Sequence, residues 1–175
     1  MRKILVLIFF SLIFSFSLFS ESNFIIAVQS DGSEIKVYLN KNVKEKAFFL
    51  SDNDDTNTHT INFKGFDSVG ELDYIDCFTL PYLENYDFLA EVKSCKSIYL
   101  GYAHYFDFNI LKNVKNLEEI DFEGFISEED FQEIKRNGID VSELKYLKKL
   151  IFNPAGYKID FDLKIKYAED VSEEK

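Results

Sequence analysis

The residues with the widest chemical scope in this chain are its two cysteines, because a thiolate can form a disulfide, bind a metal ion or act as a nucleophile. Cys77 and Cys95 are far apart in the sequence and neither belongs to a C-x-x-C pair. The spacing therefore matches no common metal-binding or redox motif. A disulfide, in an exported protein, is the remaining chemistry that the pair could support.

The two histidines, His59 and His104, stand apart from each other and from any catalytic motif. His59 follows an acidic run, residues 52–55, which suggests Ca²⁺ binding as one alternative. A loop of the EF-hand type needs glycine at its sixth position and glutamate at its twelfth, where this chain has Asn57 and Phe63. A solvated polar loop is the favoured interpretation, and no metal site is predicted.

Motifs for covalent or metal-assisted catalysis are also missing from the sequence, which contains no G-x-S-x-G, no H-E-x-x-H and no glycine-rich phosphate loop. We therefore predict a protein that is not an enzyme and that uses no catalytic residue and no cofactor. Carboxylate pairs assembled only by the fold are the alternative that this reasoning leaves open.

Composition favours one folded, acidic domain. The 175 residues are 46% hydrophobic and 17% aromatic, which is enough to build a packed core. The formal charge of -11 and the pI near 4.7 disfavour binding to nucleic acid or to an anionic membrane, because both need basic patches.

Residues 1–22 have the pattern of a secretory signal peptide. Arg2 and Lys3 precede an apolar run over residues 4–19, which is shorter than the ~20 residues that a spanning helix needs. Ser20 and Ser22 supply the small residues of a cleavage site, and no cysteine follows the run for lipid attachment. We expect export with cleavage near Ser22; an uncleaved membrane anchor is the alternative.

An apolar frame with successive spacings of 3, 3, 3 and 2 residues occurs four times after residue 65. Its members are Phe66, Val69, Leu72, Ile75, Cys77; Leu89, Val92, Cys95, Ile98, Leu100; Leu111, Val114, Leu117, Ile120, Phe122; and Val141, Leu144, Leu147, Leu150, Phe152. Spacings of three suit a loosely helical approach, and the final spacing of two suits a short strand. A single unit of this size cannot bury its own apolar side. We therefore expect the four units to stack, with their strands forming one parallel sheet. Ordinary amphipathic helices are the alternative.

This frame resembles the leucine-rich repeat, L-x-x-L-x-L-x-x-N/C-x-L, over residues 66–157. The resemblance implies an α/β fold: a short solenoid of about four repeats with a parallel sheet, whose concave face commonly contacts ligands. The Asn/Cys position is not kept, because Leu80, Ala103, Phe125 and Ala155 stand there. That departure removes the side chains that normally bond the turn after each strand.

One α-helix is expected in the longest repeat. Ser127 begins a Ser-x-x-Asp capping pattern with Asp130, Phe131 and Ile134 share a helical face, and Gly138 follows as a stop.

Both flanks are expected to cap the repeats. Residues 23–65 should form an N-terminal β cap that contains a β-hairpin around Asp31 and Gly32. Apolar and polar residues alternate over residues 157–167, which predicts an eleven-residue strand and a C-terminal cap strand over residues 158–168. The remaining residues, 169–175, form a charged tail.

The repeat register also bears on the cysteines. It places Cys95 beside Leu72, five residues before Cys77 and therefore ~16 Å from it along a strand. A disulfide needs Cα atoms within about 7 Å. Two buried thiols are favoured over a bridge.

Residues between the apolar strand positions would line the concave face, with columns such as Asp76, Tyr99, Asp121, Ile151 and Tyr74, Ser97, Glu119, Lys149. The residues predicted to bind a partner are Tyr74, Asp76, Phe78, Tyr99, Tyr102, Glu119, Asp121 and Glu123. Aromatic rings supply contact area and carboxylates supply orientation, so a basic or mixed-charge protein surface fits best. The alternative is that these charges only keep the face soluble.

The sequence thus predicts an exported, non-catalytic protein-binding module that uses the concave face of a solenoid. The alternative is a structural or scaffolding component of the cell envelope, held by an uncleaved signal anchor or by strand pairing. The identity of the ligand and the oligomeric state do not follow from the sequence.

Overall fold

The computed structural model describes residues 23–40, 45–52, 58–101 and 107–167. The predicted signal peptide, the charged tail and Tyr102 lie outside these residues. Within the described ranges, no helix is both long enough and apolar enough to cross a bilayer. The described chain is a mixed α/β structure built around a five-stranded parallel sheet.

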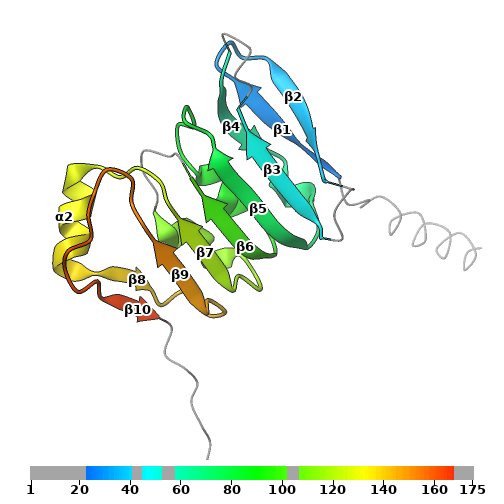
Figure 1. Ribbon diagram of the computed structural model, residues 1–175. Coiled ribbons are helices and arrows are strands. Elements are labelled where there is room, and N and C mark those ends of the chain that lie inside the picture. The colour runs from blue at the N-terminus through cyan, green and yellow to red at the C-terminus, as the bar shows by residue number, and fades with distance from the viewer. Residues whose placement is uncertain (1–22, 41–44, 53–57, 102–106, 168–175) are drawn as a thin grey trace, which may run out of the picture.

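The parallel sheet contains β3 (Ala47–Ser51), β5 (Leu72–Thr79), β6 (Cys95–Leu100), β7 (Glu119–Phe122) and β9 (Lys149–Phe152), in the order β3-β5-β6-β7-β9 (Figure 1). The last four are the strands that the repeat frame predicts. Their register aligns Ile75, Ile98, Ile120 and Leu150 in one row, as the frame requires. β3 extends the sheet by one strand that the frame did not predict.

Short 3-10 helices precede three of these strands: η1 (Phe66–Ser68), η2 (Asp87–Glu91) and η3 (Phe108–Asn113). They account for the first spacing of three in each of these frames, because a 3-10 helix has three residues per turn and Val69, Val92 and Val114 each donate their N–H to the frame residue three positions before. Before β9 the chain makes two turns instead, with Leu144 N–H donating to Val141 and Leu147 N–H to Leu144. The alternative of amphipathic α-helices is therefore wrong for these segments.

The core lies on the side of the sheet that carries these helical turns. Every member of the four apolar frames is buried except Leu150, which is half-buried because β9 is the edge strand. Full burial of one such aliphatic or aromatic side chain stabilises the fold by about 1.5–3 kcal/mol. The frame therefore defines most of the core of the sheet.

Cys77 and Cys95 are both free and buried, and Cys95 pairs with Leu72 in the ladder as the register predicted. Burial raises the pKa of the Cys95 thiol to about 12 and that of Cys77 well above its usual range. Both side chains act as small apolar groups in the core.

A separate antiparallel sheet of β2 (Glu34–Tyr38), β1 (Phe24–Gln29) and β4 (Thr60–Lys64), in the order β2-β1-β4, lies at the β3 end (Figure 1). β1 and β2 form the hairpin expected around Asp31 and Gly32, in which Gly32 has a φ of 83° and Ser33 N–H donates to Asp31. β4 was not anticipated; it pairs with β1 along the edge opposite β2.

At the other end of the parallel sheet lie α2 (Glu128–Asn137), β8 (Ile139–Val141) and β10 (Ile165–Tyr167) (Figure 1). The helix begins and ends as predicted: the Ser127 hydroxyl accepts the Asp130 N–H at 3.0 Å, and Gly138 N–H donates to Ile134. Phe131 is buried on the inner face of α2, and Ile134 is partly buried against the core.

The predicted eleven-residue strand over residues 157–167, and with it the cap strand over 158–168, is wrong in extent. Only Ile165–Tyr167 pairs, in parallel, with β8. The alternating burial is real, since the odd-numbered residues from Tyr157 to Ile165 pack against the core. Phe131 of α2 contacts Tyr157 and Phe161, and a helix side offers no free backbone groups to build a ladder. β8 offers only three residues, so the paired segment is equally short.

Candidate functional site

One face of the parallel sheet carries the core and the other is open. On the open face, the ladder aligns one row of residues across all five strands: Phe49, Asp76, Tyr99, Asp121 and Ile151. We call this the Tyr99 row. The neighbouring row is Ala47, Tyr74, Ser97, Glu119 and Lys149. The ladder thereby confirms the two predicted columns and adds a member from β3 to each.

Aromatic rings form a connected group on this face. Phe49 and Tyr74 meet edge to face with ring centroids 5.3 Å apart, and Tyr74 meets Tyr99 in the same way at 6.0 Å. Pairs with this geometry add about 0.5–1.5 kcal/mol beyond the area that they bury. Each ring is thus held in place by its neighbour before any ligand arrives.

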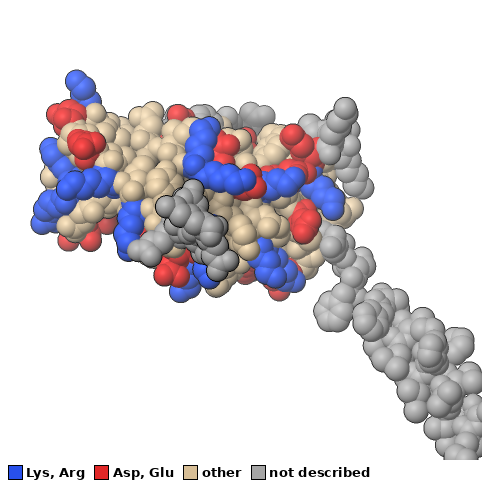
Figure 2. Space-filling view, turned by 90° about the horizontal axis from the view of Figure 1, so that it is seen from below, with Lys and Arg blue, Asp and Glu red and all other residues tan. Residues whose placement is uncertain are grey.

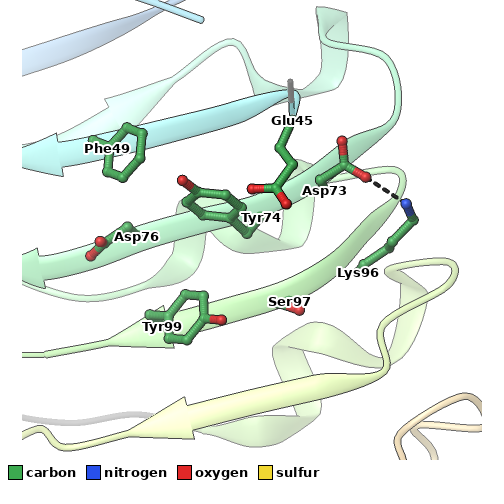
Figure 3. A pocket seen from close by; sticks show the side chains of 8 residues that line it. All are labelled: Glu45, Phe49, Asp73, Tyr74, Asp76, Lys96, Ser97 and Tyr99. Carbon is green, nitrogen blue, oxygen red and sulfur yellow. Dashed lines mark hydrogen bonds and ion pairs between the residues drawn. The ribbon is translucent and has the colours of Figure 1, made fainter. Parts of the chain in front are cut away.

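The rings line a shallow, open hollow of about 540 Å³ (Figure 3). Tyr74 and Tyr99 project from adjacent strands, with Asp76 beside them on the open face (Figure 3). The full lining is Glu45, Phe49, Asp73, Tyr74, Asp76, Lys96, Ser97 and Tyr99. Three carboxylates, three aromatic rings, one serine and a single lysine therefore surround this space.

The lysines on this face are already engaged. Lys96 pairs with Asp73 and Lys149 pairs with Glu119, each across adjacent strands. Exposed pairs of this kind contribute about 0–1 kcal/mol to stability. Each lysine nevertheless offsets the charge of the carboxylate with which it pairs. On the side shown in Figure 2, basic and acidic side chains likewise stand next to one another rather than forming a field of one sign.

Asp121 differs from these paired acids. Its Oδ1 atom is buried and, among the described residues, has no hydrogen-bond partner. Burial raises the pKa of Asp121, as do the charges of Glu123 and Glu119, against a smaller opposing effect of Lys149. Burial also raises the pKa of Tyr99, as do the charges of Glu119, Asp121 and Asp76. The middle of the open face therefore carries unbalanced negative charge.

We expect Asp121→Asn to stabilise the protein at pH 7. Because folding raises the pKa of Asp121, the folded protein favours the protonated carboxyl. The stability that this group contributes is fully present below the unfolded pKa of about 3.9 and is lost as pH rises through the folded pKa. The gain should be below about 1 kcal/mol because solvent screens a half-exposed group. Urea unfolding at pH 7 and pH 3 measures it. The difference should vanish at pH 3, and a less stable variant at pH 7 would show that the carboxylate has a stabilising partner.

The other predicted partner-binding residues fall in different places. Glu119 pairs with Ser97 in the second row, and Glu123 is exposed just after β7. The backbone of Phe78 belongs to β5, but the structure does not describe its side chain. Tyr102 lies outside the described residues. The sequence reasoning missed Phe49, because β3 precedes the repeats and does not share their frame.

His59 is the one histidine within the described ranges, and it has a structural role. Its Nδ1 atom lies 2.9 Å from Asp52 Oδ2, and its ring stacks on Tyr82 with centroids 3.7 Å apart. Asp52 also accepts the Thr60 N–H. The rest of the predicted acidic loop lies outside the described residues, and within them no group of three or more potential metal ligands occurs.

A second hollow of about 400 Å³ lies between η3, α2 and β8, and both apolar and polar side chains line it. Three of its four carboxylates already serve the backbone and side chains nearby: Asp107 accepts from Asn109, Asp130 bonds Ser127, and Asp140 bonds Ser142. These bonds make the second hollow a poorer candidate than the open sheet face.

The fold and the open face define a mixed α/β protein with a five-stranded parallel sheet and an aromatic, acidic surface. Comparison of the chain with protein-family models, with curated proteins and with solved structures finds no match. The function must therefore be argued from the geometry itself.

Proposed function

We propose that the protein is an exported, non-catalytic module that binds a protein partner through the open face of its parallel sheet. In this proposal, residues 66–157 form a short leucine-rich-repeat-like solenoid. The antiparallel sheet caps one end, and β10 with the segment before it caps the other. The ladder register and the near-complete burial of the four frames support the repeat interpretation.

One observation carries the proposal: Phe49, Tyr74 and Tyr99 are locked edge to face on a surface that also presents Asp76 and Asp121. Tyrosine and phenylalanine are enriched at protein interfaces, where they bury large areas at low entropic cost. Complementary charge mainly determines orientation and association rate. A broad face of this composition suits a basic or mixed-charge protein surface, and its carboxylates repel the phosphates of nucleic acid.

Export rests on the sequence of residues 1–22, with their basic start, apolar run and small residues at the end. The alternative, an envelope component that assembles through its C-terminal strand, has lost support. That strand is three residues long and is already paired on one side with β8.

Site-specific photo-crosslinking in the cells that make the protein tests the proposal. A photoreactive phenylalanine derivative placed at Phe49 should give a crosslinked protein partner, because this side chain is 43% exposed at the edge of the hollow. The matched position is Tyr167, an aromatic residue of β10 that is 39% exposed.

An adduct from Phe49 alone supports binding by the open face. An adduct from Tyr167 alone overturns the proposal in favour of assembly through the C-terminal strand. If neither position gives an adduct, that result contradicts protein binding by the open face.

A further inference from the structure

We infer that the Tyr99 row is a clamp for an arginine side chain of the partner: the guanidinium group stacks on the Tyr99 ring between the carboxylates of Asp76 and Asp121. This inference rests on the proposed function and identifies the group that the open face recognises. It is argued from the register, the chemistry of the three side chains and the charge around them.

The register places the three residues side by side. Asp76 pairs with Tyr99 and Tyr99 pairs with Asp121 on three successive strands. Neighbouring strands lie about 4.8 Å apart, so the Cα atoms of the two aspartates are about 10 Å apart with one aromatic residue between them. All three side chains leave the same face of the sheet, because residues that pair directly in a ladder point the same way.

A planar cation fits this arrangement better than a metal ion. A calcium ion binds its oxygen ligands at about 2.3–2.6 Å, and carboxylates on either side of a tyrosine ring are too far apart to share one. A guanidinium group stacks on an aromatic face and carries five N–H donors that reach outward in its plane. A lysine ammonium is a compact point charge and cannot serve the ring and both carboxylates in the same way.

The charges on the face favour a cation at this point. Lys96 and Lys149 are held by Asp73 and Glu119, so neither sits over the Tyr99 ring as a bound cation. The Oδ1 atom of Asp121 has no hydrogen-bond donor among the described residues, so no N–H or O–H group described there offsets the charge of this carboxylate through that atom. Burial is the main cause of the raised pKa values of Asp121 and Tyr99, and the neighbouring carboxylates raise both pKa values further.

The rings are positioned in advance. Tyr74 braces Tyr99 edge to face at 6.0 Å and is itself braced by Phe49 at 5.3 Å. A ligand therefore does not have to order the aromatic surface on binding, which preserves affinity. Interfaces concentrate their binding energy in such central aromatic anchors, and arginine is prominent among the groups that they engage.

The test uses fluorescein-labelled hexa-arginine and hexa-lysine peptides and the full chain as isolated from the cells that make it. Fluorescence anisotropy at physiological ionic strength should give at least a tenfold lower Kd for hexa-arginine. Tyr99→Leu and Asp121→Asn should each weaken hexa-arginine at least tenfold, whereas Tyr99→Phe, which keeps the ring, should bind within about twofold of the parent protein.

Matched controls separate a clamp from general attraction to an acidic protein. Glu129→Gln removes one charge from exposed α2, and Tyr146→Leu removes an aromatic residue that is 57% exposed elsewhere. Both should leave binding unchanged. Equal affinity for the two peptides, or an equal loss in Glu129→Gln and Asp121→Asn, overturns the clamp. Circular dichroism of each variant confirms that it is folded.

The experiments can overturn the arginine clamp and the protein-docking proposal independently of each other. A protein adduct at Phe49 without arginine preference overturns the clamp and keeps the docking face. Arginine preference that depends on Tyr99 and Asp121, without any adduct at Phe49, overturns protein docking and keeps a site for a guanidinium group.

Discussion

Phe122→Ala is expected to lower the free energy of unfolding by about 3–5 kcal/mol, the largest effect of any single core truncation that we predict. Phe122 is fully buried in β7, stacks on Phe152 with centroids 5.4 Å apart and meets Phe108 edge to face at 6.0 Å. Removing the ring leaves a cavity between the sheet and η3 that these neighbours fill only in part. Urea unfolding of the full chain, followed by far-ultraviolet circular dichroism, measures the loss.

Tyr146→Ala is the matched control, because it removes an aromatic ring that is 57% exposed. Surface truncations of this kind usually change stability by less than about 0.5 kcal/mol. A loss in Phe122→Ala as small as that of the control would contradict the placement of Phe122 in the core.

The regular spacing of apolar residues in the sequence predicted the parallel sheet well, for a physical reason. Each repeat must present apolar residues to the same shared core, so Ile75, Ile98 and Ile120 recur at equivalent positions and pair directly in the ladder. Once the core row is fixed, strand alternation places Asp76, Tyr99 and Asp121 on the opposite face. The open face of the four repeat strands could therefore be predicted residue by residue without any contact information.

The edges of the sheet could not be predicted in this way. β3 joins the sheet by packing Phe48 and Leu50 into the core, but it stands alone, and one short apolar run has no second copy to establish its register. The segment over residues 157–167 shows the opposite failure. Its alternation correctly predicted which side chains face inward, yet alternation does not reveal whether a backbone partner is present.

The conformations of individual side chains also could not be predicted from the sequence. The spacing placed Tyr74 and Tyr99 on one face, but it did not show that they meet edge to face, because that depends on rotamers fixed by packing. Nor did it distinguish Asp121 from the neighbouring carboxylates. Only the folded chain shows that Lys149 engages Glu119, and that the buried Oδ1 atom of Asp121 has no donor in the part of the chain that the structure describes.

Gly138→Ala is expected to detach the C-terminal segment from the body of the protein. Gly138 ends α2 with φ 79° and ψ -168°, a backbone conformation that is essentially restricted to glycine. An added Cβ atom would also lie 2.2 Å from the carbonyl oxygen of Lys164, which accepts the Ile139 N–H that starts the pairing of β8 with β10. Relief of that contact requires the carbonyl to move away, and the ladder bond is then lost.

We expect Gly138→Ala to cost about 2–4 kcal/mol, combining about 1–3 kcal/mol of backbone strain with the lost ladder contacts. Hydrogen exchange with mass spectrometry should show lost protection at residues 139–141 and 165–167, while β5 and β6 keep theirs. Gly156→Ala is the control, because Gly156 has a similar φ of 86° but no atom within 4 Å of an added Cβ. Equal loss of protection in both variants would mean that backbone strain alone, and not the contact with Lys164, governs this part of the fold. Loss confined to Gly138→Ala would instead show that the C-terminal segment is held to the sheet by the close approach of the chain to this glycine.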